Sequence, residues 1–232
     1  MYVVDSGVRT SHREFHNEMS SSSKVPIKDG SEAVSSTSGK IGVGINFVDD
    51  GDGGSSGGGR RGEVNGRAWD RYGAFADCDG HGTHIAATVA GNDVGVAPSV
   101  VVHPVRVLGC DGAGRASDVV SGLEWVAAHV MSERRKIPRT STSTAGAGSV
   151  WPSVVTLALG VPAGEWSRAL ERAAAALTTR LGILVVVASG NFRSDACTVS
   201  PGRITETLTV AASVGPGTAK TQRVKAGADE PA

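Results

Sequence analysis

The chain has 232 residues, 40% of them hydrophobic, and its 23 basic and 23 acidic side chains leave a formal net charge of zero. That length fits one large domain or two small ones, and the neutral balance gives no indication of a nucleic-acid partner or of binding to an anionic membrane surface. The longest unbroken apolar run, residues 183–188, is far below the roughly 18 residues that span a bilayer, so no transmembrane helix is expected.

The chain opens on a short β-type run, Tyr2–Val4, which ends at the polar turn Asp5-Ser6-Gly7. One helical turn is predicted at Ser11–Phe15. Met1 leads directly into the first strand, so no signal peptide is recognisable. We therefore expect the complete protein to have further sequence upstream.

Three stretches lack a regular apolar period and are predicted to be surface insertions. They lie near residues 19–39, which are rich in Ser and Lys, near 49–73, which are rich in Gly, and near 132–150, which are first basic and then rich in Ser, Thr and Gly. Between the first two, residues Lys40–Val48 alternate apolar and other side chains, which predicts a strand.

The segment Asp77–Gly91 begins with acidic and glycine residues, passes through His81 and His84, and continues with small apolar residues. Small side chains let a helix pack close to a neighbour. The glycines on both sides of His81 indicate that its imidazole lies at the start of this helix. With an ordinary pKa of about 6.5, a histidine there is a candidate general base, although a lone histidine in such a place is more often a capping or solvated residue.

Strands and helices alternate through the rest of the chain. Apolar runs predict four strands, at Val100–Val107, Val154–Leu159, Ile183–Ala188 and Thr207–Ala212. Helical spacing predicts two helices, one from Ala116 to Val130 with Ser117 as N-cap, and one from Trp166 to Leu177 with Gly182 as C-terminal cap. The alternation predicts an α/β fold with three αβα layers and a mainly parallel central sheet. Working residues of such sheets lie at the carboxyl ends of the strands.

Two segments together resemble the aspartate and histidine motifs of the subtilisin-like serine proteases (subtilases, peptidase S8), especially their proteinase K-like branch. These segments are Val3-Val4-Asp5-Ser6-Gly7-Val8 and Asp77–Gly91. The resemblance implies a subtilisin-like sheet in which Asp5 orients His81 and His81 is the base for a serine nucleophile. It also implies, from Val187-Ala188-Ser189-Gly190-Asn191, that the Asn191 amide stabilises the oxyanion, a donor whose loss typically slows such enzymes by about 10²–10³.

The resemblance further implies a cleft in which a polypeptide substrate pairs with edge segments as an added strand. By similarity, Leu159 and Gly160 line one side of the specificity pocket, and Ala188, Ser189 and Gly190 line the other. The segment that holds substrate residues further from the scissile bond is Gly112, Ala113 and Gly114.

The chain has three cysteines. Cys78 and Cys110 resemble the two halves of a disulfide in secreted proteinase K-like enzymes, and two free thiols remain the alternative because the count is odd. Cys197 resembles the first half of a second bridge whose partner would lie further along.

The nucleophile is the main departure from the family pattern. Subtilases carry it in a Gly-Thr-Ser-Met-Ala-x-Pro helix well beyond the asparagine, and no such motif occurs in these 232 residues. We therefore expect residues 1–214 to be an incomplete subtilase catalytic domain, truncated before the serine and without the C-terminal part of the fold, followed by a divergent, disordered tail at 215–232. The chain alone is expected to be inactive. The alternative function is a pseudo-protease module that binds peptides without cleaving them.

The resemblance also implies a secreted or vacuolar full-length protein, a monomer, with an inhibitory propeptide as a further partner. It allows structural calcium, but no loop has a clear carboxylate cluster, so neither a metal site nor a cofactor is assigned. Two other mechanisms are disfavoured. An aspartic protease needs a second Asp-Ser/Thr-Gly turn, and a zinc site through His81 and His84 lacks a third ligand.

Overall fold

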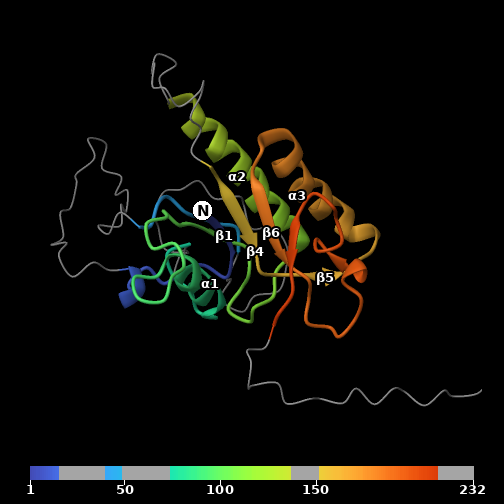
Figure 1. The fold of residues 1–232 in the computed structure, drawn as a ribbon, viewed down its shortest axis with the longest axis horizontal. Coiled ribbons are helices and arrows are strands. Elements are labelled where there is room, and N and C mark those ends of the chain that lie inside the picture. The colour runs from blue at the N-terminus through green and yellow to red at the C-terminus, as the bar shows by residue number, and fades with distance from the viewer. Residues whose placement is uncertain (16–39, 49–73, 137–151, 214–232) are drawn as a thin grey trace, which may run out of the picture.

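The computed structural model describes residues 1–15, 40–48, 74–136 and 152–213, which form a six-stranded sheet with helices on both faces (Figure 1). The sheet order is β2-β3-β1-β4-β6-β8, and each neighbouring pair is parallel. These strands are β1 Tyr2–Asp5, β2 Ile45–Asn46, β3 His103–Arg106, β4 Val154–Leu157, β6 Leu184–Ala188 and β8 Leu208–Val210. A separate antiparallel pair joins β5 Val161–Pro162 to β7 Val199–Ser200.

The helices are α1 His81–Ala90, α2 Ala116–Lys136 and α3 Arg168–Leu181, and the shorter 3-10 turns are η1 Arg13–Phe15, η2 Glu165–Ser167 and η3 Ala196–Thr198. No helix within the described ranges is long and apolar enough to cross a membrane.

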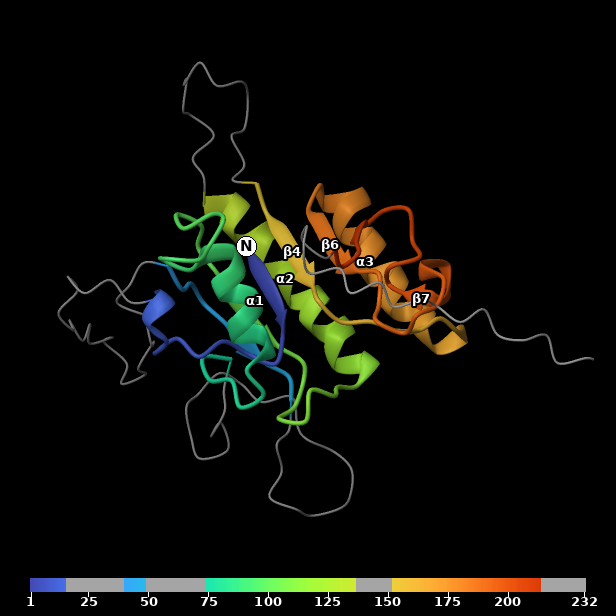
Figure 2. The same cartoon turned by 60° about the horizontal axis from the view of Figure 1, so that its bottom comes forward.

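The two faces of the sheet carry two separate cores. Successive side chains of a strand point to opposite faces, and in β1 Tyr2 and Val4 join the larger core with residues of α2 and α3, whereas Val3 joins the smaller core with residues of α1. Figures 1 and 2 show α1 on the other side of the sheet from α2 and α3. The expected three-layer α/β fold with a mainly parallel sheet is confirmed.

Helix α1 covers only part of its face of the sheet. The register aligns Val3 with Thr156, Thr156 with Val186, and Val186 with Leu208, so side chains of β4, β6 and β8 continue the α1 face. Several of them are exposed there: Leu184 by 45%, Leu208 by 52% and Val210 by 51%. We call the patch formed by Thr156, Leu184, Val186, Ala188, Leu208 and Val210 the open half-face; no helix in the described part of the chain covers it.

Several predicted boundaries are wrong. The strand expected at 40–48 is reduced to Ile45–Asn46 and one bridge between Ile41 and Val102, because this edge strand pairs only with β3. The N-cap prediction for Ser117 fails, since α2 already begins at Ala116. The basic residues assigned to the third insertion extend α2 as far as Lys136, and cations suit the carboxyl end of a helix.

The second predicted helix begins later than its apolar pattern indicated, because Trp166 belongs to η2 and α3 starts at Arg168. Gly182 does end α3 in the left-handed conformation, with φ 62°, as predicted. The first two insertions, the remainder of the third and the tail beyond residue 213 lie outside the described residues.

Candidate active site

Strand β1 and helix α1 bring Asp5 and His81 into direct contact. Asp5 is the last residue of β1 and His81 is the first residue of α1. The Nδ1 atom of His81 lies 2.8 Å from Oδ1 of Asp5. The Asp5 side chain is 1% exposed and the His81 side chain 46% exposed. A buried carboxylate thus holds one face of an imidazole whose other side reaches solvent.

The hydrogen bond between Asp5 and His81 affects the pKa of the carboxyl and the tautomer of the imidazole. Burial raises the pKa of the Asp5 carboxyl, and hydrogen bonds from His81 and from the Ser6 backbone counteract part of that rise. The second oxygen, Oδ2, has no hydrogen-bond partner in the part of the chain described. Ionised Asp5 therefore favours the ring tautomer with its proton on Nδ1, which leaves the outer nitrogen free to accept a proton.

Glycines allow this close approach. A Cβ atom built on Gly82 would lie 2.1 Å from the backbone oxygen of Gly7, and one built on Gly7 would lie 2.1 Å from the oxygen of Ala76. Gly7 also has φ +106°, which side chains rarely tolerate. Gly82 is therefore needed for α1 to touch the turn after β1, and Gly7 is needed for that turn to pack against Ala76.

A cleft of about 480 Å³ lies beside His81. It contains five residues of the predicted substrate segments, namely Leu159, Gly160, Gly112, Ala113 and Gly114. Three segments far apart in the sequence thus meet at the carboxyl ends of β3 and β4, where parallel sheets form ligand sites.

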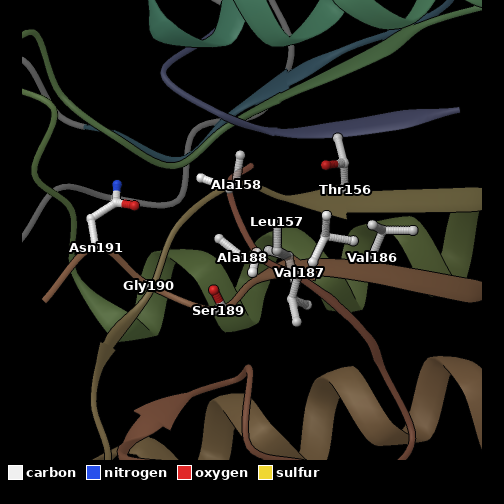
Figure 3. A pocket seen from close by; sticks show the side chains of 12 residues that line it. Thr156, Leu157, Ala158, Val186, Val187, Ala188, Ser189, Gly190 and Asn191 are labelled. Carbon is white, nitrogen blue, oxygen red and sulfur yellow. The ribbon is translucent and has the colours of Figure 1, made fainter. Parts of the chain in front are cut away.

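The other predicted wall lies in an adjoining hollow of about 360 Å³. Ala188, Ser189, Gly190 and Asn191 line it, together with residues of the open half-face such as Thr156 and Val210 (Figure 3). Ala158 borders both hollows. The sequence prediction put His81 and Asn191 in one cleft, whereas among the described residues they line neighbouring ones.

Val199 packs against both predicted walls of the specificity pocket, a role that the sequence did not indicate. A Cβ atom on Gly160 or on Gly190 would lie 3.1 Å from Cγ1 of Val199. Val199 is 1% exposed and belongs to β7, whose pairing with β5 holds it there. No local pattern marks this residue, because its neighbours come from other segments.

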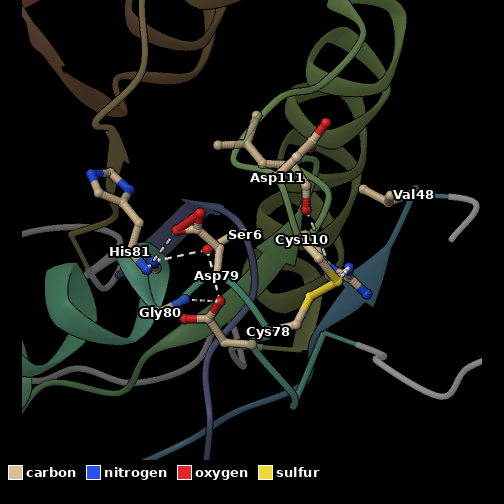
Figure 4. The surroundings of a disulfide bond; sticks show 12 residues. Ser6, Val48, Cys78, Asp79, Gly80, His81, Cys110 and Asp111 are labelled. Carbon is tan, nitrogen blue, oxygen red and sulfur yellow. Dashed lines mark hydrogen bonds between the residues drawn. A yellow bond between two sulfur atoms is a disulfide. The ribbon is translucent and has the colours of Figure 1, made fainter.

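Cys78 and Cys110 form the predicted disulfide, across 32 residues of sequence (Figure 4). The guanidinium of fully buried Arg106 packs beside it, with Nη2 3.6 Å from Sγ of Cys78 and 3.9 Å from Sγ of Cys110. The bridge joins the loop before α1 to the loop that carries Gly112. Cys197 is free and exposed.

Ser6, Asp77 and Thr83 form a hydrogen-bonded network beneath the Asp5–His81 pair that the sequence analysis did not single out. Ser6 donates to Asp77 over 2.9 Å, and Thr83 donates to Asp77 from both its backbone and its hydroxyl. An aspartate close upstream of a helix is a candidate acceptor for the amides of the first turn, and this signal was available in the sequence.

Two features are absent from the described ranges. They contain no group of three or more His, Cys, Asp or Glu side chains that could hold a metal ion. They also show no serine hydroxyl hydrogen-bonded to His81, whose ring bonds to Asp5.

The chain is similar to a known family and to several known proteins. Residues 2–223 match the Subtilase family, peptidase S8. The chain is 34% identical over 212 residues to an extracellular serine proteinase of Thermus sp. (strain Rt41A), covering 91% of this chain and 36% of that protein. It is 32% identical over 210 residues to alkaline serine exoprotease A of Vibrio alginolyticus, covering 90% and 27%.

A third relative is proprotein convertase subtilisin/kexin type 9 of Rattus norvegicus, 41% identical over 136 residues, which cover 59% of this chain and 17% of that protein. A crystal structure of a cold adapted subtilisin-like serine proteinase superimposes with a TM-score of 0.54 and 29% identity, covering 90% of this chain and 52% of that one. The chain therefore spans about a third or less of the length of these curated relatives. With its parallel sheet, its Asp5–His81 contact and a family match over nearly its whole length, the chain belongs to the subtilase family of serine peptidases.

Proposed function

We propose that Asp5 and His81 are the acid–base part of a serine endopeptidase centre that hydrolyses polypeptides. The observation that carries the proposal is the 2.8 Å hydrogen bond between a buried carboxylate and a half-exposed imidazole. The free nitrogen of His81 takes the proton of an attacking serine hydroxyl and then gives it to the leaving amine. Asp5 keeps the ring in the required tautomer and stabilises its charged form.

Asn191 completes this centre as the oxyanion donor. Its amide borders the hollow next to that of His81, with Ala158 between the two. A carbonyl oxygen that becomes negative between these hollows is stabilised by a hydrogen-bond donor fixed at that position. Peptide substrate then runs along Gly112–Gly114 and along Leu159-Gly160, on the side of His81.

We further propose that the 232 residues do not hydrolyse peptides by themselves, because they lack the Gly-Thr-Ser-Met motif that carries the family's nucleophile. The open half-face supports a site for the absent element. Its exposed Leu208 and Val210 favour burial under another segment. The hollow that this half-face borders also contains Asn191, and Ala158 joins it to the cleft of His81, so we place the serine of the absent segment at this junction.

The test compares the 232-residue chain with a fusion that adds the segment of the Thermus relative that follows the matched region. Each is treated with a serine-directed fluorophosphonate and assayed with a fluorogenic peptide. We expect labelling and cleavage only in the fusion, and loss of both in its His81→Ala variant. Labelling of a serine in the unfused chain would contradict the inactive state, and a folded fusion that never reacts would contradict the catalytic roles.

The second candidate function is a pseudo-protease that binds peptides without cleavage. The cleft of about 480 Å³ and its glycine segments support this function, since they are formed in the 232-residue chain, which lacks the nucleophile motif. Fluorescence polarisation with labelled peptides distinguishes the two functions. Saturable binding by the unfused chain favours the binding module, whereas binding that appears only in the fusion favours the enzyme.

The proposed setting is a secreted or vacuolar monomer. Support comes from the Thermus relative, an extracellular serine proteinase, and from the disulfide, which persists in oxidising compartments. The Cys78–Cys110 bridge also supports the proteinase K-like branch. Polypeptides are the substrates, an inhibitory propeptide is a further partner of the full-length protein, and no metal or cofactor is assigned.

A further inference from the structure

The carboxylate of Asp77 lies at the centre of the contact between β1 and α1. It is 6% exposed. Its Oδ1 atom accepts hydrogen bonds from the Gly80 backbone over 2.8 Å and from the Ser6 hydroxyl over 2.9 Å. Its Oδ2 atom accepts from the Thr83 backbone over 2.8 Å and from the Thr83 hydroxyl over 2.6 Å. Both oxygens are thus occupied, by donors from the turn after β1 and from the start of α1.

On the helix side, Asp77 accepts the hydrogen bonds that an N-cap side chain usually accepts. The residue at the N-cap position is Gly80, which has φ 99° and no side chain that could accept from the first turn. The amide groups at the start of a helix need an external acceptor. Asp77 supplies it from three residues further upstream, and its negative charge suits the positive end of the helix.

On the strand side, the Ser6 hydroxyl connects Asp77 to β1. Ser6 donates to Asp77 and at the same time accepts a hydrogen bond from the Gly82 backbone over 3.0 Å. Ser6 follows Asp5 and Gly82 follows His81. The Ser6–Gly82 bond therefore runs directly beside the Asp5–His81 bond, and the Ser6 backbone also donates to Oδ1 of Asp5 over 2.8 Å.

The protonation state of Asp77 agrees with this arrangement. Burial by itself raises the pKa of the carboxyl, but the hydrogen bonds from Thr83, Gly80 and Ser6 outweigh it and hold the pKa of Asp77 below its usual range. At neutral pH the group is therefore a charged acceptor, and charged acceptors make stronger hydrogen bonds than neutral ones.

We infer that Asp77 is a positioning residue, which fixes the distance and angle of the Asp5–His81 hydrogen bond by holding Ser6 and the first turn of α1 together. This role rests on the proposed function of Asp5 and His81. The hydrogen bonds of Asp77 go to Ser6, Gly80 and Thr83, and not to Asp5 or His81. It acts through Ser6 and Gly82, so its loss changes the alignment of the pair before it changes the fold.

The test follows the proton shared by His81 and Asp5, in the 232-residue chain with its disulfide intact. Protein labelled with ¹⁵N-histidine is studied by proton NMR, where a short hydrogen bond of this kind gives a low-field signal. We expect Asp77→Asn to abolish this signal or to speed its exchange with water roughly tenfold or more, in line with the loss of an ordinary hydrogen bond. The asparagine amide can accept on only one side and opposes the donors on the other.

Ser6→Ala is the second variant, because it cuts the connection to β1 and keeps every bond from Asp77 to α1. It decides the question if Asp77→Asn does not fold, and the same loss of signal is expected. Asp195→Asn is the matched control. That carboxylate accepts from the Cys197 backbone and caps the short turn η3, away from His81, so the signal should be unchanged.

A signal that keeps its position and exchange rate in folded Asp77→Asn or Ser6→Ala would overturn the inference, even if the unfolding midpoint falls, since that pattern indicates a role in stability alone. Absence of the signal from the unsubstituted protein would overturn it as well. The measurement needs no catalysis. A fusion that fails to hydrolyse peptides would therefore count against the proposed function and leave this result standing.

Discussion

Replacement of Gly82 by alanine should separate Asp5 from His81. The added Cβ would lie 2.1 Å from the backbone oxygen of Gly7 and 3.2 Å from Cβ of Asp5. A backbone oxygen cannot rotate away as a side chain can. Real Cβ atoms essentially never lie closer than 3.0 Å to such an atom. Because the interior is well packed and the new methyl group has no other space, α1 and the Gly7 turn must move apart by about 0.9 Å.

A shift of that size would stretch the Asp5–His81 hydrogen bond from 2.8 Å to roughly 3.7 Å, beyond the usual range. Overpacking of this kind costs about 1–3 kcal/mol. We therefore expect Gly82→Ala to lower the free energy of unfolding by that amount and to abolish the low-field proton signal of His81. In the active fusion the same change should remove most of the peptidase activity.

Gly122→Ala is the matched control. Gly122 is a helical glycine in α2, and its added Cβ would meet side-chain methyls, Cγ1 of Val107 at 2.9 Å and Cγ1 of Val105 at 3.0 Å. The change should reduce stability in urea denaturation and leave the His81 signal intact. If Gly82→Ala keeps both its stability and its signal, the Asp5–His81 hydrogen bond does not depend on the close approach of α1 to the turn after β1.

Three further predictions concern stability. Replacing Cys78 and Cys110 together by alanine should cost about 3–4 kcal/mol in urea denaturation, since the bridge closes 32 residues; a cost below about 1 kcal/mol would contradict this. Burial lowers the pKa of His103 from 6.5 to about 4, so folding favours the neutral ring. The neutral ring should therefore stabilise the fold fully above pH 6.5, and the free energy of unfolding should fall by at most roughly 3 kcal/mol as the pH drops to about 4. His103→Gln should flatten that pH profile. Gly182→Ala should cost about 1–2 kcal/mol, because Gly182 has φ +62° with nothing within 4 Å of an added Cβ. A thermal melt that does not change would show that α3 ends without strain.

The α/β class, the main helices and strands and the aspartate and histidine motifs could be predicted from the sequence. Each of these depends on neighbours within a few residues. An apolar run such as Ile183–Ala188 predicts a buried strand, and a glycine such as Gly182 predicts the end of a helix, because backbone geometry is local. Boundaries were less accurate, as Ser117 shows, since the Arg115 carbonyl accepts the first amides of α2 and the helix begins at Ala116.

What only the tertiary structure decided involves residues far apart in the chain. Asp77 meets Ser6 across 71 residues, and Val199 reaches both Gly160 and Gly190 from a separate strand pair. The two hollows that replace the predicted single cleft are likewise lined by segments far apart in the sequence. No periodic pattern encodes such contacts, because they arise only when burial of the two cores brings β1, α1 and the strand ends together.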